Sequence, residues 1–329
     1  MKNLYLIAET ACSHDGSVTR LKKIIDNVIK AEFEAIQIQI WKNENILPPN
    51  HEDIKILKKV EISYKNWKKI ISYIRSKSKR IEIIACIYDQ DALNFCIKNK
   101  IKIFKLHSSD LSNEILIKNV SKKAKRIDLS IGSSTEREIT NALKWIGKSC
   151  ETWLMYGYQL FPTDPNKINL RFLGYLKKKY KIRIGYQDHS PFDISSFTIP
   201  ATAVGSGIEI IEKHVTDFNV RKGTDGQSAI EIKNFNLFVK KIKEAYLSLG
   251  EGKKINFSKE EIKYRTYSKK IILFSKNLKK DHVLKFEDFA FFRTGKKGEM
   301  IDGYKKFIGK RILKNVKKYE ALNYKFINK

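Results

Sequence analysis

Two histidines occupy equivalent places in the sequence, each near the end of a short apolar run. His189 follows the run that starts at Ile182, and His214 follows the run that starts at Gly207. Each run reads as a buried strand, and residues 192–206 between them are enough for one crossover helix. This order places both imidazoles at the carboxyl ends of neighbouring parallel strands, where ligands bind in α/β folds. Two neutral imidazoles so placed could begin a divalent-metal site.

The alternative is that the two histidines are unrelated, one at a loop and one packed in a core, and spacing alone leaves both readings open. Polar residues at the exits of the other apolar runs favour a shared site. A barrel needs apolar strands but has no structural need for charged residues at so many strand ends. The residues expected on one rim are Glu9, Gln37, Gln39, Lys105, Ser108, Ser130, Gln159, Asp188, His189, Glu212 and His214.

Eight apolar runs alternate with helical patterns along residues 1–250. Between the first two runs, residues 18–30 place Leu21, Ile24 and Ile25 on one helical face. Eight strand–helix units at this spacing predict an α/β fold, a (β/α)8 TIM barrel. The runs are 4–8, 35–40, 81–85, 101–106, 126–131, 153–156, 182–185 and 209–212.

The alternation of apolar runs and helical patterns stops after the last barrel helix, which is predicted at 231–249. A charged linker is expected over 251–267, followed by a small second domain over 268–329. Short strands are predicted there at Lys270–Phe274, Phe286–Phe289 and Phe291–Arg293. About sixty residues are few for independent stability, so this domain is expected to pack against a partner surface.

The chain is strongly basic, with 65 Lys and Arg against 36 Asp and Glu and a formal charge of +29. Such a charge can indicate a nucleic-acid-binding protein. Here the lysines are dispersed along the chain and no nucleic-acid-binding motif is present, so we expect a solvated surface and no nucleic-acid partner. A basic field could still draw in an anionic substrate.

The four cysteines, Cys12, Cys86, Cys96 and Cys150, lack metal-type spacing and suggest reduced thiols. The chain enters a strand almost at once, without the pattern of a signal peptide, and no apolar run approaches a membrane span. We therefore expect a cytoplasmic protein without a membrane partner.

Several motifs resemble those of the sialic acid (N-acetylneuraminate) synthase family. Ile7-Ala8-Glu9 with Ser13-His14-Asp15-Gly16 resembles the family's Ile-Ala-Glu … Asn-His-Asn-Gly start. The stretch 104–111 resembles Phe-Lys-Ile-Ala-Ser-Gly-Asp-Leu, and 185–190 resembles Gly-Tyr-Ser-Asp-His-Thr. Residues 211–214 match Ile-Glu-Lys-His, and the C-terminal part, through 293–295 and 308–310, resembles the family's antifreeze-like (SAF) domain.

The resemblance implies a phosphoenolpyruvate-dependent synthase. The family condenses phosphoenolpyruvate with an N-acyl hexose such as N-acetylmannosamine, releasing phosphate and giving a nine-carbon 2-keto sugar acid. His189 and His214 would hold a divalent metal, expected to be Mn²⁺ with Mg²⁺ or Co²⁺ as alternatives, acting as a Lewis acid. Lys105 with hydroxyl groups suits a compact dianion.

The resemblance also assigns the remaining roles. The catalytic set would be Glu9, Lys105 and Glu212. The phosphoenolpyruvate-binding set would be Lys105, Ser108, Ser130, Gln159 and Gln39. The sugar-binding set would be Glu9, Phe161, Asp225 and Arg293. Arg293 matches an arginine that reaches the active site of the other subunit, which implies a domain-swapped homodimer.

The sequence departs from the family pattern at several of these positions. Gln37 replaces a phosphate-binding lysine, Cys86 a threonine, and Gln187 a serine; the others are Ile87 for proline, Gln159 for asparagine, Phe161 for tyrosine and Gly226 for histidine. The departures leave two further hypotheses open. One is a synthase for a legionaminate- or pseudaminate-type acid. The other is a catalytically silent relative that binds a sugar or another anion, nucleic acid included.

Overall fold

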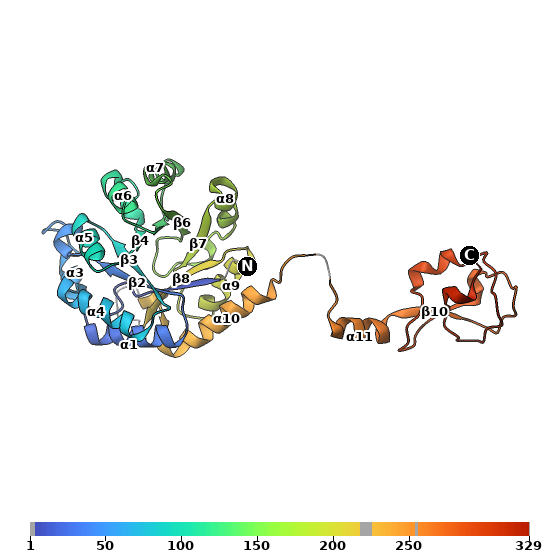
Figure 1. The fold of residues 1–329 in the computed structure, drawn as a ribbon. Coiled ribbons are helices and arrows are strands. Elements are labelled where there is room, and N and C mark those ends of the chain that lie inside the picture. The colour runs from blue at the N-terminus through green and yellow to red at the C-terminus, as the bar shows by residue number, and fades with distance from the viewer. Residues whose placement is uncertain (1–3, 218–225, 254–255, 329) are drawn as a thin grey trace. The chain divides into compact units, whose positions relative to one another are not determined.

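In the computed structural model, eight parallel strands close into a barrel that helices surround (Figure 1). The structure describes residues 4–217, 226–253 and 256–328. Each strand pairs with the next in parallel, and β1 also pairs with β8, which closes the sheet. The predicted (β/α)8 barrel is therefore confirmed. The strands are β1 (Tyr5–Glu9), β2 (Ala35–Ile40), β3 (Glu82–Ile87), β4 (Ile103–Leu106), β5 (Arg126–Ser130), β6 (Glu151–Tyr156), β7 (Arg183–Asp188) and β8 (Ile210–Thr216).

Five of the helices between the strands, α1, α4, α5, α6 and α7, begin at a polar residue whose side chain caps the helix, and each buries one apolar face. Thr135, for example, forms a capping box with Glu138, which satisfies free backbone N–H groups at the start of α7. The covering helices are α1 (Val18–Lys30), α4 (Tyr64–Lys77), α5 (Gln90–Lys98), α6 (Glu114–Ser121), α7 (Glu136–Ile146), α8 (Arg171–Tyr180), α9 (Ser195–Gly205) and α10 (Phe235–Ser248). The loop after β2 adds α2 (Asn43–Ile46) and α3 (Ile54–Val60), which the sequence pattern did not predict.

Successive side chains on each barrel strand point to opposite faces and pack into two separate apolar cores. On β2, Ile36, Ile38 and Ile40 belong to the large core between strands and helices. Residues with the opposite parity, such as Ile7 and Ala35, form a smaller core inside the barrel. Because successive side chains on a strand point to opposite faces, Glu9 and Gln37 continue the inner rows toward the carboxyl end.

The amino end of the barrel is filled by a charged and aromatic cluster. The Arg126 guanidinium lies 3.7 Å from the centre of the Trp153 ring and 4.9 Å from that of Tyr5. Arg126 Nε also donates to Asp128 Oδ1 at 2.9 Å, and Arg126 Nη1 to Glu82 Oε2 at 3.1 Å. This packing satisfies an arginine of which only 4% is exposed.

The chain divides into two compact units, Met1–Glu251 and Gly252–Lys329. In the second unit, β10 (Lys270–Phe274) pairs in antiparallel fashion with β11 (Phe289–Arg293) over a small apolar core that includes Phe274, Leu284 and Phe307. The segment 251–267, predicted as a linker, contains most of α11 (Lys259–Ser268), which starts at a capping box between Ser258 and Glu261.

One strand prediction in the second unit is wrong. Phe286–Asp288 forms a 3₁₀ turn, and the strand starts at Phe289. The buried carboxylate of Asp288 accepts from the backbone N–H of Lys285 at 2.9 Å, which closes the turn before the strand begins.

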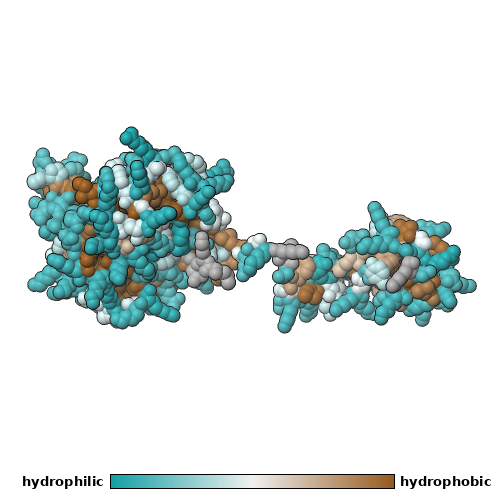
Figure 2. All heavy atoms as spheres, turned by 45° about the horizontal axis from the view of Figure 1, so that its top comes forward, coloured by the Kyte–Doolittle hydropathy of each residue, from teal (hydrophilic) through white to brown (hydrophobic). Residues whose placement is uncertain are grey.

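Hydrophilic side chains spread over the faces of both units that Figure 2 shows, rather than gathering in one stripe. No helix within the described residues is both long and apolar enough to cross a bilayer.

We predict that Arg126→Met destabilises the protein by about 3–5 kcal/mol, because it leaves the buried Asp128 carboxylate without its cation. The measurement is the free energy of unfolding in urea. Arg137→Met, on the exposed surface of α7, is the matched control and is expected to change it by less than about 0.5 kcal/mol. Arg126→Met/Asp128→Asn should recover part of the loss, and equal stability of Arg126→Met and the wild type would contradict the role given to this pair.

A second prediction concerns the close approach of β6 and β7. A Cβ on Gly157 would lie 2.6 Å from the backbone oxygen of Gln187 and 2.7 Å from its Cβ. Gly157→Ala should therefore cost about 1–3 kcal/mol, since backbone must shift to admit the methyl group. The control is Gly174→Ala in α8, where no atom lies within 4 Å and alanine should stabilise by roughly 0.5–1 kcal/mol. Thermal unfolding of both variants measures the difference, and similar melting temperatures would refute the prediction.

Candidate active site

The carboxyl end of the barrel collects a ring of buried polar side chains, which we call the mouth cluster: Glu9, Gln37, Lys105, Ser130, Gln187 and Glu212. Strand register brings its members side by side. Glu9 is aligned with Gln37 on β2 and with His214 on β8, and Gln187 is aligned with Glu212. Residues that are far apart in the sequence therefore face one another inside the barrel.

Lys105 and Glu212 form the central ion pair of the mouth cluster. Lys105 Nζ lies 2.5 Å from Glu212 Oε1, and both side chains are at most 5% exposed. Burial opposes the charge on Lys105, but attraction to Glu212 and Glu9 outweighs it and raises the pKa of the ammonium. The ammonium therefore stays charged at neutral pH, which suits it to bind a carboxylate or phosphate.

Gln187 connects this pair with Ser130 on β5. Its Nε2 donates to Glu212 Oε1 at 3.0 Å, and its Oε1 accepts from Ser130 Oγ at 2.9 Å. Glu212 Oε2 is buried and has no hydrogen-bond partner among the described residues. Neither has the side-chain amide of Gln37 within that part of the chain. Buried polar atoms without partners are costly, and a polar ligand would satisfy them.

Glu9 is held at the rim by its neighbours. Its Oε1 accepts from the backbone N–H of Ala11 at 2.6 Å and from Gln39 Nε2 at 3.4 Å. Gln39 Oε1 in turn accepts from the Tyr88 hydroxyl at 3.4 Å. The carboxylate is thereby fixed at the entrance, where it could bind a hydroxyl group or transfer a proton.

The two histidines of the opening motif lie together. Their ring centres are 5.2 Å apart, and the ring of Phe161 packs against both, at 4.3 Å from His189 and 5.5 Å from His214. His189 Nδ1 is 2.7 Å from the carbonyl oxygen of Tyr158. A carbonyl can only accept, so Nδ1 carries the proton and Nε2 keeps its lone pair. Burial lowers the pKa of His189 to about 4, so the imidazole is neutral at physiological pH.

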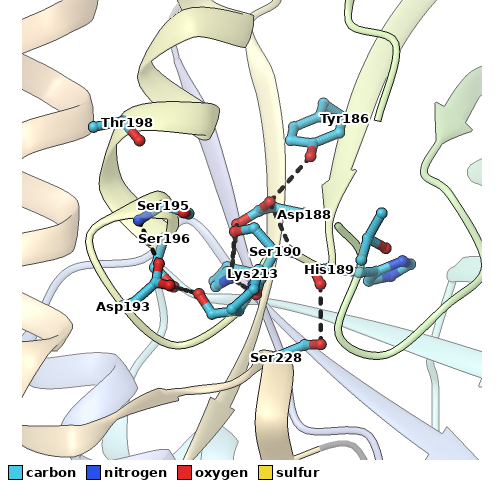
Figure 3. A network of polar contacts seen from close by, with 12 residues as sticks. Tyr186, Asp188, His189, Ser190, Asp193, Ser195, Ser196, Thr198, Lys213 and Ser228 are labelled. Carbon is cyan, nitrogen blue, oxygen red and sulfur yellow. Dashed lines mark hydrogen bonds and ion pairs between the residues drawn. The ribbon is translucent and has the colours of Figure 1, made fainter. Parts of the chain in front are cut away.

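Backbone contacts hold the His189 turn. The His189 carbonyl accepts from the Thr163 N–H at 2.8 Å and from Ser228 Oγ at 3.0 Å (Figure 3). A neutral imidazole with its second nitrogen fixed by a carbonyl is the usual form of a histidine that binds metal.

The histidine pair fits a divalent metal. The described residues provide no group of three or more His, Cys, Asp and Glu side chains that could enclose an ion. Two imidazoles with several open positions would suit a metal that also binds water or substrate oxygens, as Mn²⁺ and Mg²⁺ do.

The remaining predicted residues lie as follows. Ser108 starts a 3₁₀ turn directly after β4, and Gln159 packs against Gly132, where an added Cβ would come within 2.4 Å of its Nε2. Asp225 lies outside the described residues. Arg293 is exposed at the end of β11 in the second unit, which is described by itself, so its role as a sugar ligand stays a prediction.

Two residues at the site were given no chemistry from the sequence. The sequence marks Gln187 only as a departure from the family pattern, yet in the structure this residue connects Ser130 with Glu212. His107 follows β4 and accepts from the Ser109 N–H through Nδ1 at 3.2 Å. Burial, then the charge of Lys105, lowers its pKa to about 4. Its place directly after a strand exit was the signal that could have marked it.

Cys86 is unsuited to nucleophilic chemistry. It is buried beside Lys105 in the register of β3 and β4. Burial raises the pKa of its thiol to about 12, against the effect of Lys105, so the thiolate is absent at neutral pH.

Comparison with known proteins identifies the family of this chain. Residues 24–254 match the model of the NeuB family. The chain is 25% identical to an N,N'-diacetyllegionaminic acid synthase of Campylobacter jejuni, over 98% of this chain and 99% of the relative. It is 24% identical to a pseudaminic acid synthase of the same species, over 98% and 96%.

A solved structure extends the comparison to the fold. The N-acetylneuraminic acid (sialic acid) synthetase of Leptospira borgpetersenii superposes with a TM-score of 0.73 at 29% identity, covering 81% of this chain and 92% of that one. The family match spans well over half of the chain and includes both histidines and the mouth cluster except Glu9. The chain thus belongs to the NeuB family and is an enzyme, a phosphoenolpyruvate-dependent synthase of sugar acids.

Proposed function

We propose that this enzyme condenses phosphoenolpyruvate with an N-acyl hexose in a metal-dependent reaction that yields a nine-carbon 2-keto sugar acid and phosphate. The observation that carries the proposal is the Lys105–Glu212 pair, with Glu212 Oε2 unpartnered among the described residues, in the same barrel mouth as two neighbouring imidazoles. An anion-binding ammonium, a free carboxylate oxygen and a pair of metal-type ligands are the parts that this condensation needs.

The chemistry joins C3 of phosphoenolpyruvate to the aldehyde carbon of the open-chain sugar. The aldehyde oxygen takes up a proton, water adds to C2 of phosphoenolpyruvate, and the C2–O bond to phosphate breaks to leave a keto group. A divalent metal held by His189 and His214 would polarise the aldehyde as a Lewis acid. Every atom of the two substrates and one water is then accounted for in the keto acid and phosphate.

The chain's own residues perform the binding and proton transfer. Lys105 binds the carboxylate or phosphate of phosphoenolpyruvate, assisted by the hydroxyls of Ser108 and Ser130 and by the amides of Gln39 and Gln159. Glu212 orients Lys105 through Oε1 and can accept a proton from the attacking water through Oε2. Glu9 holds a sugar hydroxyl or supplies the proton at the aldehyde oxygen.

Charge balance in the mouth supports dependence on a metal. Of the mouth-cluster side chains, Glu9 and Glu212 are carboxylates and Lys105 is the ammonium that opposes them. The neutral amide of Gln37 adds no positive charge where the family has lysine. Phosphoenolpyruvate brings further negative charge, so a divalent cation at the histidines would offset what the protein leaves uncompensated.

A second candidate acceptor is a diacetamido hexose of the legionaminate or pseudaminate type. The names of the two Campylobacter relatives support it, as does Phe161, a residue that is 37% exposed and whose ring packs beside both imidazoles. An apolar ring face suits the methyl group of a second acetamido substituent better than it suits a hydroxyl group.

The test is phosphate release from phosphoenolpyruvate by the purified full-length chain with Mn²⁺. N-acetylmannosamine and a set of diacetamido hexoses serve as acceptors, with and without a chelator. We expect release that requires an acceptor and stops on chelation, because the Lewis acid supplies several kcal/mol to the transition state. His189→Ala and His214→Ala should each lose at least about a hundredfold in rate.

His51→Ala is the matched control, since His51 lies in a loop and its ring is bound near Asp53. It should retain the wild-type rate. Full activity in either site variant would contradict the metal role, and absence of release with every acceptor from folded, Mn²⁺-loaded protein would contradict the condensation itself.

A further inference from the structure

Lys213 stands between Glu212 and His214 on β8 but points to the opposite side of the sheet. Its neighbours two residues away, Ile211 and Val215, belong to the core between strands and helices. Lys213 is fully buried there, with Nζ 2.7 Å from Asp188 Oδ2. The side chain is therefore outside the barrel interior and cannot touch a substrate bound in the mouth.

Asp188, the partner, immediately precedes His189 at the end of β7. The register of β7 and β8 aligns Asp188 with Lys213, so the ion pair joins the residues that directly precede the two histidines. Figure 3 shows Asp188 and Lys213 beside His189.

The ion pair of Asp188 and Lys213 also holds the turn around His189 through hydrogen bonds. Asp188 Oδ1 accepts from the Tyr186 hydroxyl at 3.0 Å and from the Ser190 N–H at 3.2 Å, and Oδ2 accepts from Ser190 Oγ at 2.9 Å. Lys213 Nζ adds contacts to the Ser190 carbonyl at 3.3 Å and to Ser190 Oγ at 3.4 Å. Residues on both sides of His189 are thus tied to the residue before His214.

A buried ion pair is a poor way to gain stability alone. Apolar side chains of the same volume often stabilise as well or better, because they avoid the cost of removing two charges from water. What the pair supplies instead is a directional link of fixed length between two strand ends. Metal affinity depends on such links, since outer-shell partners that orient ligands typically contribute 10–100-fold.

We propose that Lys213 is a positioning residue that, through Asp188, sets the separation and orientation of His189 and His214 for a divalent metal. The inference rests on the proposed function, because it takes the two imidazoles as the metal ligands. Lys213 acts through the backbone of both strands and takes no part in the chemistry.

The test is the dissociation constant for Mn²⁺, measured by the electron paramagnetic resonance signal of free Mn²⁺ during titration of the full-length protein without substrates. The variant is Lys213→Met/Asp188→Asn, which removes both charges together and so leaves no uncompensated buried ion. Asparagine keeps an oxygen that can accept from Tyr186 and Ser190. We expect a folded protein whose dissociation constant rises about 10–100-fold.

The matched control is Arg126→Met/Asp128→Asn, which removes the buried ion pair on β5, toward the amino end of the barrel. It perturbs stability in a comparable way but is expected to leave the Mn²⁺ dissociation constant unchanged. Equal weakening in both variants would mean general loosening of the fold and would overturn the inference, as would unchanged affinity in the Lys213 variant.

The Mn²⁺ affinity of the wild type and a second variant, Ser190→Ala, separate the remaining outcomes. If the wild type itself fails to bind Mn²⁺, the metal part of the proposed function fails, which is a different result from wild-type binding that the double variant retains. If the double variant does not fold, Ser190→Ala replaces it, because it removes one hydroxyl that bridges Asp188 and Lys213. A several-fold rise in its dissociation constant supports the positioning role, and an unchanged constant overturns it.

Discussion

The pairing of β1 with β8 closes the sheet, and the mouth of the barrel depends on this closure. Glu9 on the first strand comes opposite His214 on the last only because the register of that pairing is fixed. A slip by one residue would turn every inward side chain of β8 toward the helices, exchanging Glu212 for Lys213. The apolar residues that alternate with them hold the register, since Ile211 and Val215 have no other place to be buried.

Two buried ion pairs lie inside the barrel, and their surroundings differ. They are Arg126 with Asp128 and Lys105 with Glu212, and the small inner core beside them includes Ile7, Ile84 and Ile210. In the first pair, the Arg126 guanidinium packs against the Trp153 ring and also donates a hydrogen bond to Glu82. The pair at the carboxyl end leaves one carboxylate oxygen without a partner among the described residues. The same kind of interaction therefore contributes to packing in the first pair and, under the proposed function, to ligand binding in the second.

Much of this arrangement could be predicted from the sequence, and the failures have physical causes. The eight apolar runs and their polar exits follow local periodicity, which a sequence displays directly. The contact between Lys105 and Glu212 spans 107 residues and exists only once the barrel has closed, so no local pattern predicts it. The partner of Lys213 needed the register of β7 against β8. The helix α11 has no buried face, so no apolar periodicity indicates it in the sequence. Only its capping residues, Ser258 and Glu261, are typical of a helix start.

The filled amino end has a consequence for the order in which substrates arrive. Tyr5, Arg126 and Trp153 occupy that end, which leaves the carboxyl side, past Glu9 and the two histidines, for a ligand that approaches Lys105. If phosphoenolpyruvate binds beside Lys105 as proposed, it takes the deeper place and the bulkier sugar lies above it. The proposed roles, together with the closed base, therefore imply a sequence of addition, with phosphoenolpyruvate first, in a reaction whose chemistry alone would allow either order.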